Sequence, residues 1–258
     1  MKKILLSFAL CLAVMSAMAQ KQTKTYTYDG FTGVSVSHSF QVTVQKSDVF
    51  SIEVSVEKDY LPYLDVRKND DVLHIGFTAD LPRKLRTKSS KIASARISMP
   101  VLSAVSLSGS ADMKCEGSFS SGMRGIDIYL SGASSLKGYS VSGTEVDIEL
   151  SGSSLVDCEI VADKVDANVS GASRVNVSGT AETLKAQISG ASALLASSFS
   201  VKEASVEASG ASKVRVAPVN ELKVSLSGAS SCTYEANETL KINARSITGA
   251  SSLKPVSK

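Results

Sequence analysis

The chain has 258 residues, with 28 Lys or Arg against 25 Asp or Glu and a formal net charge of +3. Such a balance argues against a nucleic-acid-binding surface, which needs a basic patch or stripe. With 17 Gly, only 5 Pro and no Trp, and with many Ser, Val and Ala, the composition is typical of β-strands joined by tight turns rather than of helices.

The first residues predict an export signal. Lys2 and Lys3 precede an apolar run, and Ala17-Met18-Ala19 has the small-x-small pattern of a cleavage site. We therefore expect residues 1–19 to be removed, and the remainder to reach the periplasm, the cell surface or the medium. The apolar run is shorter than the ~20 residues that span a bilayer, and we expect no transmembrane segment elsewhere.

Residues 20–102 predict an N-terminal β-rich part of the fold with long connections. Apolar residues alternate with polar ones from Val34 to Val44, which is the strand periodicity. His38 and His74 lie in strand-like stretches without a metal or catalytic motif, so we expect both to be structural. A basic loop follows, which we interpret as a solvated excursion, with contact to an anionic surface as the alternative. It contains Arg83, Lys84, Arg86, Lys88 and Lys91.

Residues 103–258 repeat a short Ser-Gly pattern, as in Leu130-Ser131-Gly132-Ala133-Ser134. The repeated glycine recurs about every 20 residues, which is typical of a solenoid. Apolar residues stand two positions before and four positions after it, and polar residues lie between, so each repeat predicts strands with one buried face. The glycines are Gly109, Gly132, Gly152, Gly171, Gly190, Gly210, Gly228 and Gly249.

These repeats predict an all-β parallel β-helix, in which coils stack ~4.8 Å apart. The glycine would take positive φ at a bend between two strands. The Ser two positions after it, such as Ser134, should point inward, where we expect the stacked hydroxyls to donate to one another. Tyr129 and Tyr139 are expected to point outward.

Three cysteines remain after export: Cys115, Cys158 and Cys232. Cys115 and Cys158 share a column two coils apart, and the resulting ~9.6 Å exceeds the ~7 Å limit for a disulfide. We therefore expect three buried free thiols.

One order of motifs resembles a known family. Val72-Leu73-His74-Ile75 is followed by Arg96-Ile97-Ser98-Met99-Pro100-Val101-Leu102 and then by Leu107-Ser108-Gly109-Ser110-Ala111. Over roughly residues 30–255 this is similar to the putative auto-transporter adhesin, head GIN domain family, a domain of unknown function common in secreted proteins of Bacteroidetes. The resemblance implies a right-handed β-helix and an exported location, and it transfers no catalytic residues.

One acidic stripe is a candidate chemical site. Asp127, Asp147 and Asp166 occupy one outward column of successive coils, and Glu149 lies on the same face as Asp147. Carboxylates stacked at ~4.8 Å repel one another unless water or a cation intervenes. We interpret the stripe as solvated, with a Ca²⁺ site and glycoside hydrolase or lyase chemistry as alternatives. No Ser-His-Asp triad appears, so we expect neither catalysis nor a cofactor.

The function predicted from the sequence is that of a non-enzymatic, adhesin-like binding module, secreted or held at the envelope, with a surface glycan or a protein as ligand. The alternatives are a carbohydrate-active enzyme on the β-helix face and an envelope scaffold component. Lys254, Pro255 and Lys258 resemble protection of a strand edge, which favours a monomer or weak dimer.

Overall fold

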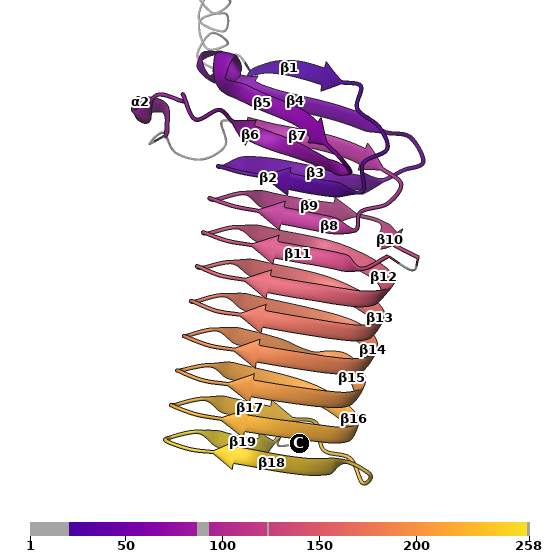
Figure 1. The fold of residues 1–258 in the computed structure, drawn as a ribbon, viewed down its shortest axis with the longest axis vertical. Helices are drawn as coiled ribbons and strands as arrows, with labels where there is room; N and C mark the ends of the chain where they lie inside the picture. Colours follow the sequence, from indigo (N-terminus) through magenta and orange to yellow (C-terminus); the bar gives the residue numbers. More distant parts are fainter. Residues whose placement is uncertain (1–20, 87–92, 123, 257–258) are drawn as a thin grey trace, which may run out of the picture.

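The computed structural model describes residues 21–86, 93–122 and 124–256. The predicted signal peptide, Lys88, Lys91 and Lys258 lie outside this part of the chain. Figure 1 shows an elongated stack of coils with the N-terminal elements at one end and the last coil at the other. Within the described ranges, no helix has both the length and the apolar character needed to cross a membrane.

In the described residues before Pro100, there are seven strands and two short helical turns. They are β1 (Lys21–Tyr26), β2 (Gly33–Val36), β3 (Phe40–Lys46), β4 (Ser51–Glu57), the 3-10 helix η1 (Lys58–Tyr63), β5 (Leu64–Asn69), β6 (Val72–Phe77), α2 (Arg83–Arg86) and β7 (Ala93–Met99). The repeats follow as β8 (Ala104–Leu107), β9 (Asp112–Glu116), β10 (Ser118–Ser120), β11 (Ile126–Leu130), β12 (Ser135–Leu150), β13 (Leu155–Val169), β14 (Arg174–Ile188), β15 (Ala193–Ala208), β16 (Lys213–Leu226), β17 (Ser231–Tyr234), β18 (Lys241–Ile247) and β19 (Ser252–Pro255).

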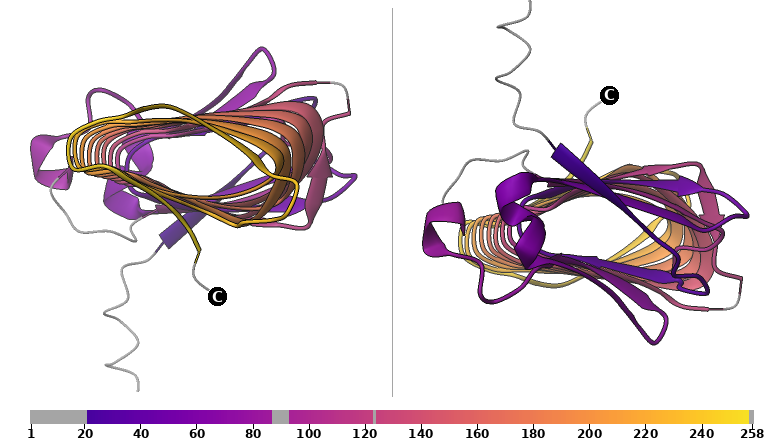
Figure 2. Two further views of the ribbon diagram at one scale, coloured as in Figure 1. Left: turned by 90° about the horizontal axis from the view of Figure 1, so that it is seen from below. Right: turned by 90° about the horizontal axis from the view of Figure 1, so that it is seen from above.

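The repeats form a flattened parallel β-helix, as the sequence predicts. Each coil has two long sides joined at two corners, and the coils superimpose when the stack is viewed along its axis (Figure 2). Equivalent residues pair in parallel register from coil to coil, for example Leu130 with Leu150 and Leu150 with Val169. The inward residues of both sides fill one continuous apolar core, and the outward residues leave two broad polar faces.

The repeated glycine forms one corner of each coil. Gly132, Gly152 and Gly171 have φ of 74°, 76° and 78°, in the left-handed region that disfavours side chains. A Cβ atom at any of the three would also lie 2.4 Å from the carbonyl oxygen of the glycine one coil earlier. The corner therefore requires glycine for two independent reasons: the positive φ of the backbone and the short distance to the stacked coil.

The serines two positions after the glycine are buried, as predicted, but their hydroxyl groups bond differently from the prediction. Ser134 Oγ donates to the Ser131 carbonyl oxygen at 2.8 Å, and Ser154 Oγ donates to the Ser151 carbonyl oxygen at 2.9 Å. The expected donation from hydroxyl to hydroxyl is wrong because backbone carbonyl oxygens lie closer than the next serine, a full coil of ~4.8 Å away. For Ser173 and Ser192 the acceptor is the glycine carbonyl oxygen of the preceding coil, at 3.4 and 3.2 Å. The buried set is Ser134, Ser154, Ser173, Ser192, Ser212 and Ser230.

One of the register irregularities between coils turns an aromatic side chain inward. The pairing of β12 with β13 shifts between Lys137 and Tyr139, so Gly138 is an extra residue with φ of 68°. This bulge turns Tyr139 inward, where it is fully buried and donates to the Leu102 carbonyl oxygen at 2.6 Å. The prediction that Tyr139 points outward is therefore wrong. Further shifts occur where β14 pairs with β15, where β15 pairs with β16, and in β18, where Arg245 is the extra residue.

The N-terminal part contains a coil of its own that continues the solenoid. β2 and β3 pair in parallel with β8 and β9 on one side and with β6 and β7 on the other. Its corner is Ser37-His38-Ser39, and His38 takes the place of the glycine with φ of 68°. β8 and β9 therefore stack on β2 and β3, although more than fifty residues of chain separate the two coils in sequence.

Antiparallel strands close this end of the stack. β4 pairs with β7, β1 with β4, and β5 with β6, all antiparallel. Tyr60 of η1 lies buried against Phe77 and donates to the Leu85 carbonyl oxygen at 2.9 Å. This covering of strands and aromatic side chains keeps the apolar core of the first coils away from water.

The surroundings of His38 and the three cysteines indicate a role in packing. His38 Nδ1 lies 2.9 Å from Ser37 Oγ, and burial, with a smaller effect of Arg86, lowers the pKa of the imidazole. Cys115, Cys158 and Cys232 are buried and unpaired, which confirms the prediction of three free thiols. Burial raises the pKa of each thiol to about 12, so none is a thiolate at neutral pH.

Candidate functional site

A long groove follows the outward face of the sheet just before the glycine corner. Its volume is about 750 Å³, and it crosses β11, the C-terminal halves of β12 to β16, and β18. The floor of the groove is a single column of register partners that runs without a break through seven coils. The column consists of Tyr129, Glu149, Asn168, Gln187, Glu207, Ser225 and Ser246.

A second column of hydroxyl groups runs along one side of the groove. Ser151, Ser170, Ser189, Ser209 and Ser227 each precede the corner glycine. Because the first column lies on paired strands and the second directly follows them, donors and acceptors repeat at the coil spacing of ~4.8 Å. Tyr129, whose side chain is 46 % exposed, ends the column with an aromatic ring. The arrangement suits an extended ligand that makes the same contact once per coil.

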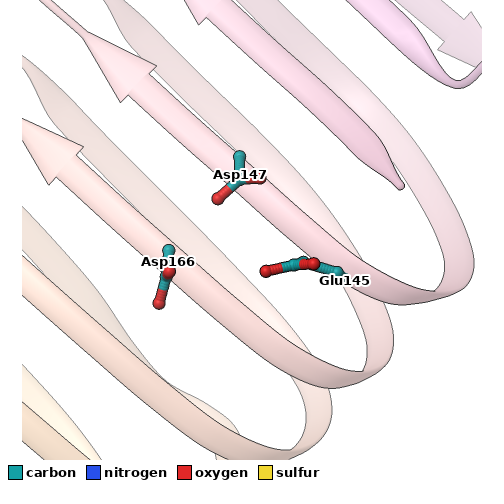
Figure 3. Close-up of side chains that lie close together, drawn as sticks. All are labelled: Glu145, Asp147 and Asp166. Carbon is teal, nitrogen blue, oxygen red and sulfur yellow. The ribbon is translucent and has the colours of Figure 1, made fainter.

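The acidic stripe lies beside this groove, two positions earlier on the same strands. Asp127, Asp147 and Asp166 are register partners, as predicted. The carboxylates that converge are nevertheless Glu145, Asp147 and Asp166, which can each place an oxygen within 4.8 Å of the others (Figure 3). Asp127 and Glu149 are not members of this group, and Glu149 lies on the floor of the groove instead.

Lys164 occupies the position where a cation would bridge the acidic group. Its ammonium lies 2.5 Å from Glu145 Oε1 and 2.9 Å from Asp166 Oδ2. These hydrogen bonds raise the pKa of the Lys164 ammonium. Partial burial, with the neighbouring carboxylates of Glu145 and Asp166, raises the pKa of Asp147. An ammonium already balances part of this charge, which leaves less of it for a metal ion.

Two features of the site lay beyond the sequence reasoning. Glu145 precedes Asp147 by two residues and shares its outward parity, but it does not stand in the predicted column of aspartates. The groove column does not stand out in the sequence because its side chains differ from coil to coil. Its signal is positional: each member stands three residues before the repeated glycine.

Comparison with solved structures finds close matches of the fold. A putative adhesin from Parabacteroides merdae ATCC 43184 matches with a TM-score of 0.82 at 20% identity, covering 93% of this chain and 98% of that one. A putative adhesin from Parabacteroides distasonis ATCC 8503 gives 0.80 at 19% identity, with the same coverage. A putative lipid binding protein from the latter organism gives 0.81 at 15% identity, again covering 93% and 98%.

A comparison with curated proteins finds no match. The model of one protein family matches residues 30–237, which include the N-terminal coils and most of the regular repeats. The match covers most of the stacked coils and agrees with the resemblance seen in the motifs around Met99 and Gly109. The chain therefore belongs to the putative auto-transporter adhesin, head GIN domain family.

Proposed function

We propose that this protein is a non-enzymatic binding module of the cell envelope or the extracellular space, and that its groove holds an extended, hydroxyl-rich polymer such as a surface glycan. The observation that carries the proposal is the unbroken polar column from Tyr129 to Ser246. Seven coils that each offer a hydrogen-bonding side chain multiply weak contacts into useful affinity.

Two further facts support a binding role. The solved structures with this fold are named putative adhesins or a putative lipid binding protein, and none of these names describes an enzyme. The acidic group that offered the alternative of glycosidase chemistry contains the Lys164 ammonium between two of its carboxylates. A carboxylate held in an ion pair is a poorer general acid than a free one in an apolar setting.

The test is a glycan-array screen of the mature protein followed by calorimetry with the oligosaccharides that bind. Replacing Asn168 and Gln187 together by Ala removes two adjacent members of the column, and we expect affinity to fall about tenfold, at ~0.5–1.5 kcal/mol for each lost hydrogen bond. Asn176→Ala is the matched control, because Asn176 lies outward on the opposite side of the coil. Equal binding by the groove variant and the control would contradict the proposal, and turnover of a bound glycan would favour the enzyme.

A further inference from the structure

The charges of the groove have one sign. Among the described residues that line it, the charged ones are Glu149 and Glu207, and both are exposed. Neither carboxylate takes part in an ion pair within the described part of the chain. Gln187 Nε2 donates to Glu207 Oε2 at 3.4 Å, which leaves the rest of that carboxylate free to accept.

The basic residues close to the groove on the same strands do not line it, and they include Arg245, which directly precedes Ser246 in β18. Lys185 and Lys223 stand two positions earlier, in the column of the acidic stripe, and are not among the residues that line the groove. The Lys223 ammonium is held by Glu221 at 2.8 Å. The groove therefore presents two carboxylates without a lysine between them.

The two carboxylates have a fixed separation. Glu149, Asn168, Gln187 and Glu207 are successive register partners, so three coil steps separate the outer pair. At ~4.8 Å per step the separation of their backbones is about 14 Å. A ligand that neutralises both must be extended and must carry cationic groups at intervals along its length.

The surroundings strengthen the preference for positive charge. Asp127, Glu145, Asp147 and Asp166 lie beside the Glu149 end of the groove, and Lys164 balances only part of this charge. Burial raises the pKa of Asp147, and the neighbouring carboxylates of Glu145, Asp166 and Asp127 raise it further. A polymer of uronate or sulfate groups would be repelled here, whereas a polycation would be attracted.

A glycan suits the groove better than a peptide does. The floor is the face of a sheet whose backbone N–H and C=O groups already pair with the coils above and below. A peptide cannot add itself as a strand on such a face, so it would lose its main source of affinity. A sugar chain binds through hydroxyl hydrogen bonds and through stacking on an aromatic ring, which the serine column and Tyr129 offer.

We propose that the groove selects a linear glycan that carries free amino groups, and that Glu149 and Glu207 receive its ammonium groups while Asn168 and Gln187 bind the hydroxyls between them. This inference rests on the proposed function and names the chemical class of its ligand. It assigns specificity to the two carboxylates and general affinity to the amides and serines.

The test uses three oligosaccharides of equal length: a glucosamine hexamer, its fully N-acetylated counterpart and a hexuronate. Calorimetry at low salt, below the pKa of the sugar amine, should show the glucosamine hexamer binding most tightly and the hexuronate not binding. The double variant Glu149→Gln and Glu207→Gln should weaken the glucosamine hexamer about tenfold and leave the N-acetylated hexamer unchanged. Glu203→Gln, in the same strand as Glu207 but outside the groove, should change neither.

The outcomes separate this inference from the proposed function. Equal affinity for the acetylated and free-amine hexamers, abolished by Asn168→Ala with Gln187→Ala, would overturn the charge selection and keep the groove. Equal affinity of a lysine hexapeptide would overturn the assignment to a glycan. If no oligosaccharide binds, the proposed function itself fails. The reversal Glu149→Lys with Glu207→Lys supports the inference if it transfers binding from the glucosamine hexamer to the hexuronate.

Discussion

The stacked glycines make a quantitative prediction that separates two costs of a side chain at the corner. Gly171→Ala places a methyl group at φ of 78° and 2.4 Å from the Gly152 carbonyl oxygen. Gly30→Ala places the same group at φ of 65°, where the nearest atom is Lys68 Nζ at 4.0 Å. Both changes incur the left-handed backbone cost of ~1–2 kcal/mol, and only the first adds a clash with backbone.

The clash determines the size of the difference. The methyl group must move away from the oxygen by about 1 Å to reach ordinary contact, and the stacked corners must separate to allow it. That movement weakens two backbone hydrogen bonds of 2.8 Å, from Ala172 N to Gly152 O and from Ala191 N to Gly171 O. At ~0.5–1.5 kcal/mol for each bond, plus the backbone cost, we expect a loss of about 2–5 kcal/mol at Gly171 against about 1–2 kcal/mol at Gly30.

The assay is guanidinium unfolding followed by far-ultraviolet circular dichroism, since the chain has no Trp. The effect of Ala on the unfolded chain is the same at both positions and cancels in the comparison. If the free energy of unfolding falls with guanidinium concentration at the same slope in both variants, they expose the same surface on unfolding. If Gly171→Ala lost no more stability than Gly30→Ala, the close stacking of the corner glycines would be refuted.

Other predictions follow from individual contacts. Tyr139→Phe should lower the free energy of unfolding by about 1–2 kcal/mol through loss of the bond to the Leu102 carbonyl, and unchanged melting would contradict that bond. Cys115, Cys158 and Cys232 should react with a thiol reagent only in denaturant, and an intramolecular disulfide in a nonreducing mass map would contradict their free, buried state. Asp147→Asn should stabilise the fold at neutral pH by about 0.5 kcal/mol, because the folded pKa of Asp147 is raised and its ionised form is disfavoured. The gain should shrink as pH falls through that raised pKa and the wild-type carboxyl takes up a proton, so a gain that persisted in acid would be evidence against the reasoning. Titration with Ca²⁺ should release no heat, because Lys164 bridges Glu145 and Asp166, and heat that vanished in Asp147→Ala would instead establish a metal site.

The regular repeats were predictable from sequence because each structural requirement of a coil falls on the same position of every repeat. The corner glycine, the inward apolar residues and the buried serines each recur at one position, so their spacing indicates a coil. The bulge at Gly138 was not predictable in this way, since one inserted residue reverses the parity of every residue that follows it in the strand. Tyr139 therefore moved from the expected surface to the core.

The first corner and the candidate site escaped prediction for different reasons. Ser37-His38-Ser39 lacks the glycine that marks the other corners, and its partners β6 to β9 come later in the sequence. The alternation of inward and outward residues predicts the acidic stripe. Which carboxylates converge depends on the length and direction of the side chains, so the group includes Glu145 and not Asp127. The side chains of the groove vary from coil to coil, and only their position three residues before the repeated glycine marks them.

The position of the β2–β3 coil has a consequence for how the chain folds. This coil appears early in the sequence, yet both of its neighbours, β6–β7 and β8–β9, come later, and β2 pairs with β8 about seventy residues away. Closing this long loop is entropically the most demanding step. Once the loop is closed, the strands of each later coil can pair with a coil that is already folded, and each coil adds only about 20 residues. We expect a slow, cooperative nucleation at the N-terminal end followed by rapid, stepwise growth toward the C-terminus, and fraying on heating that begins with β18 and β19.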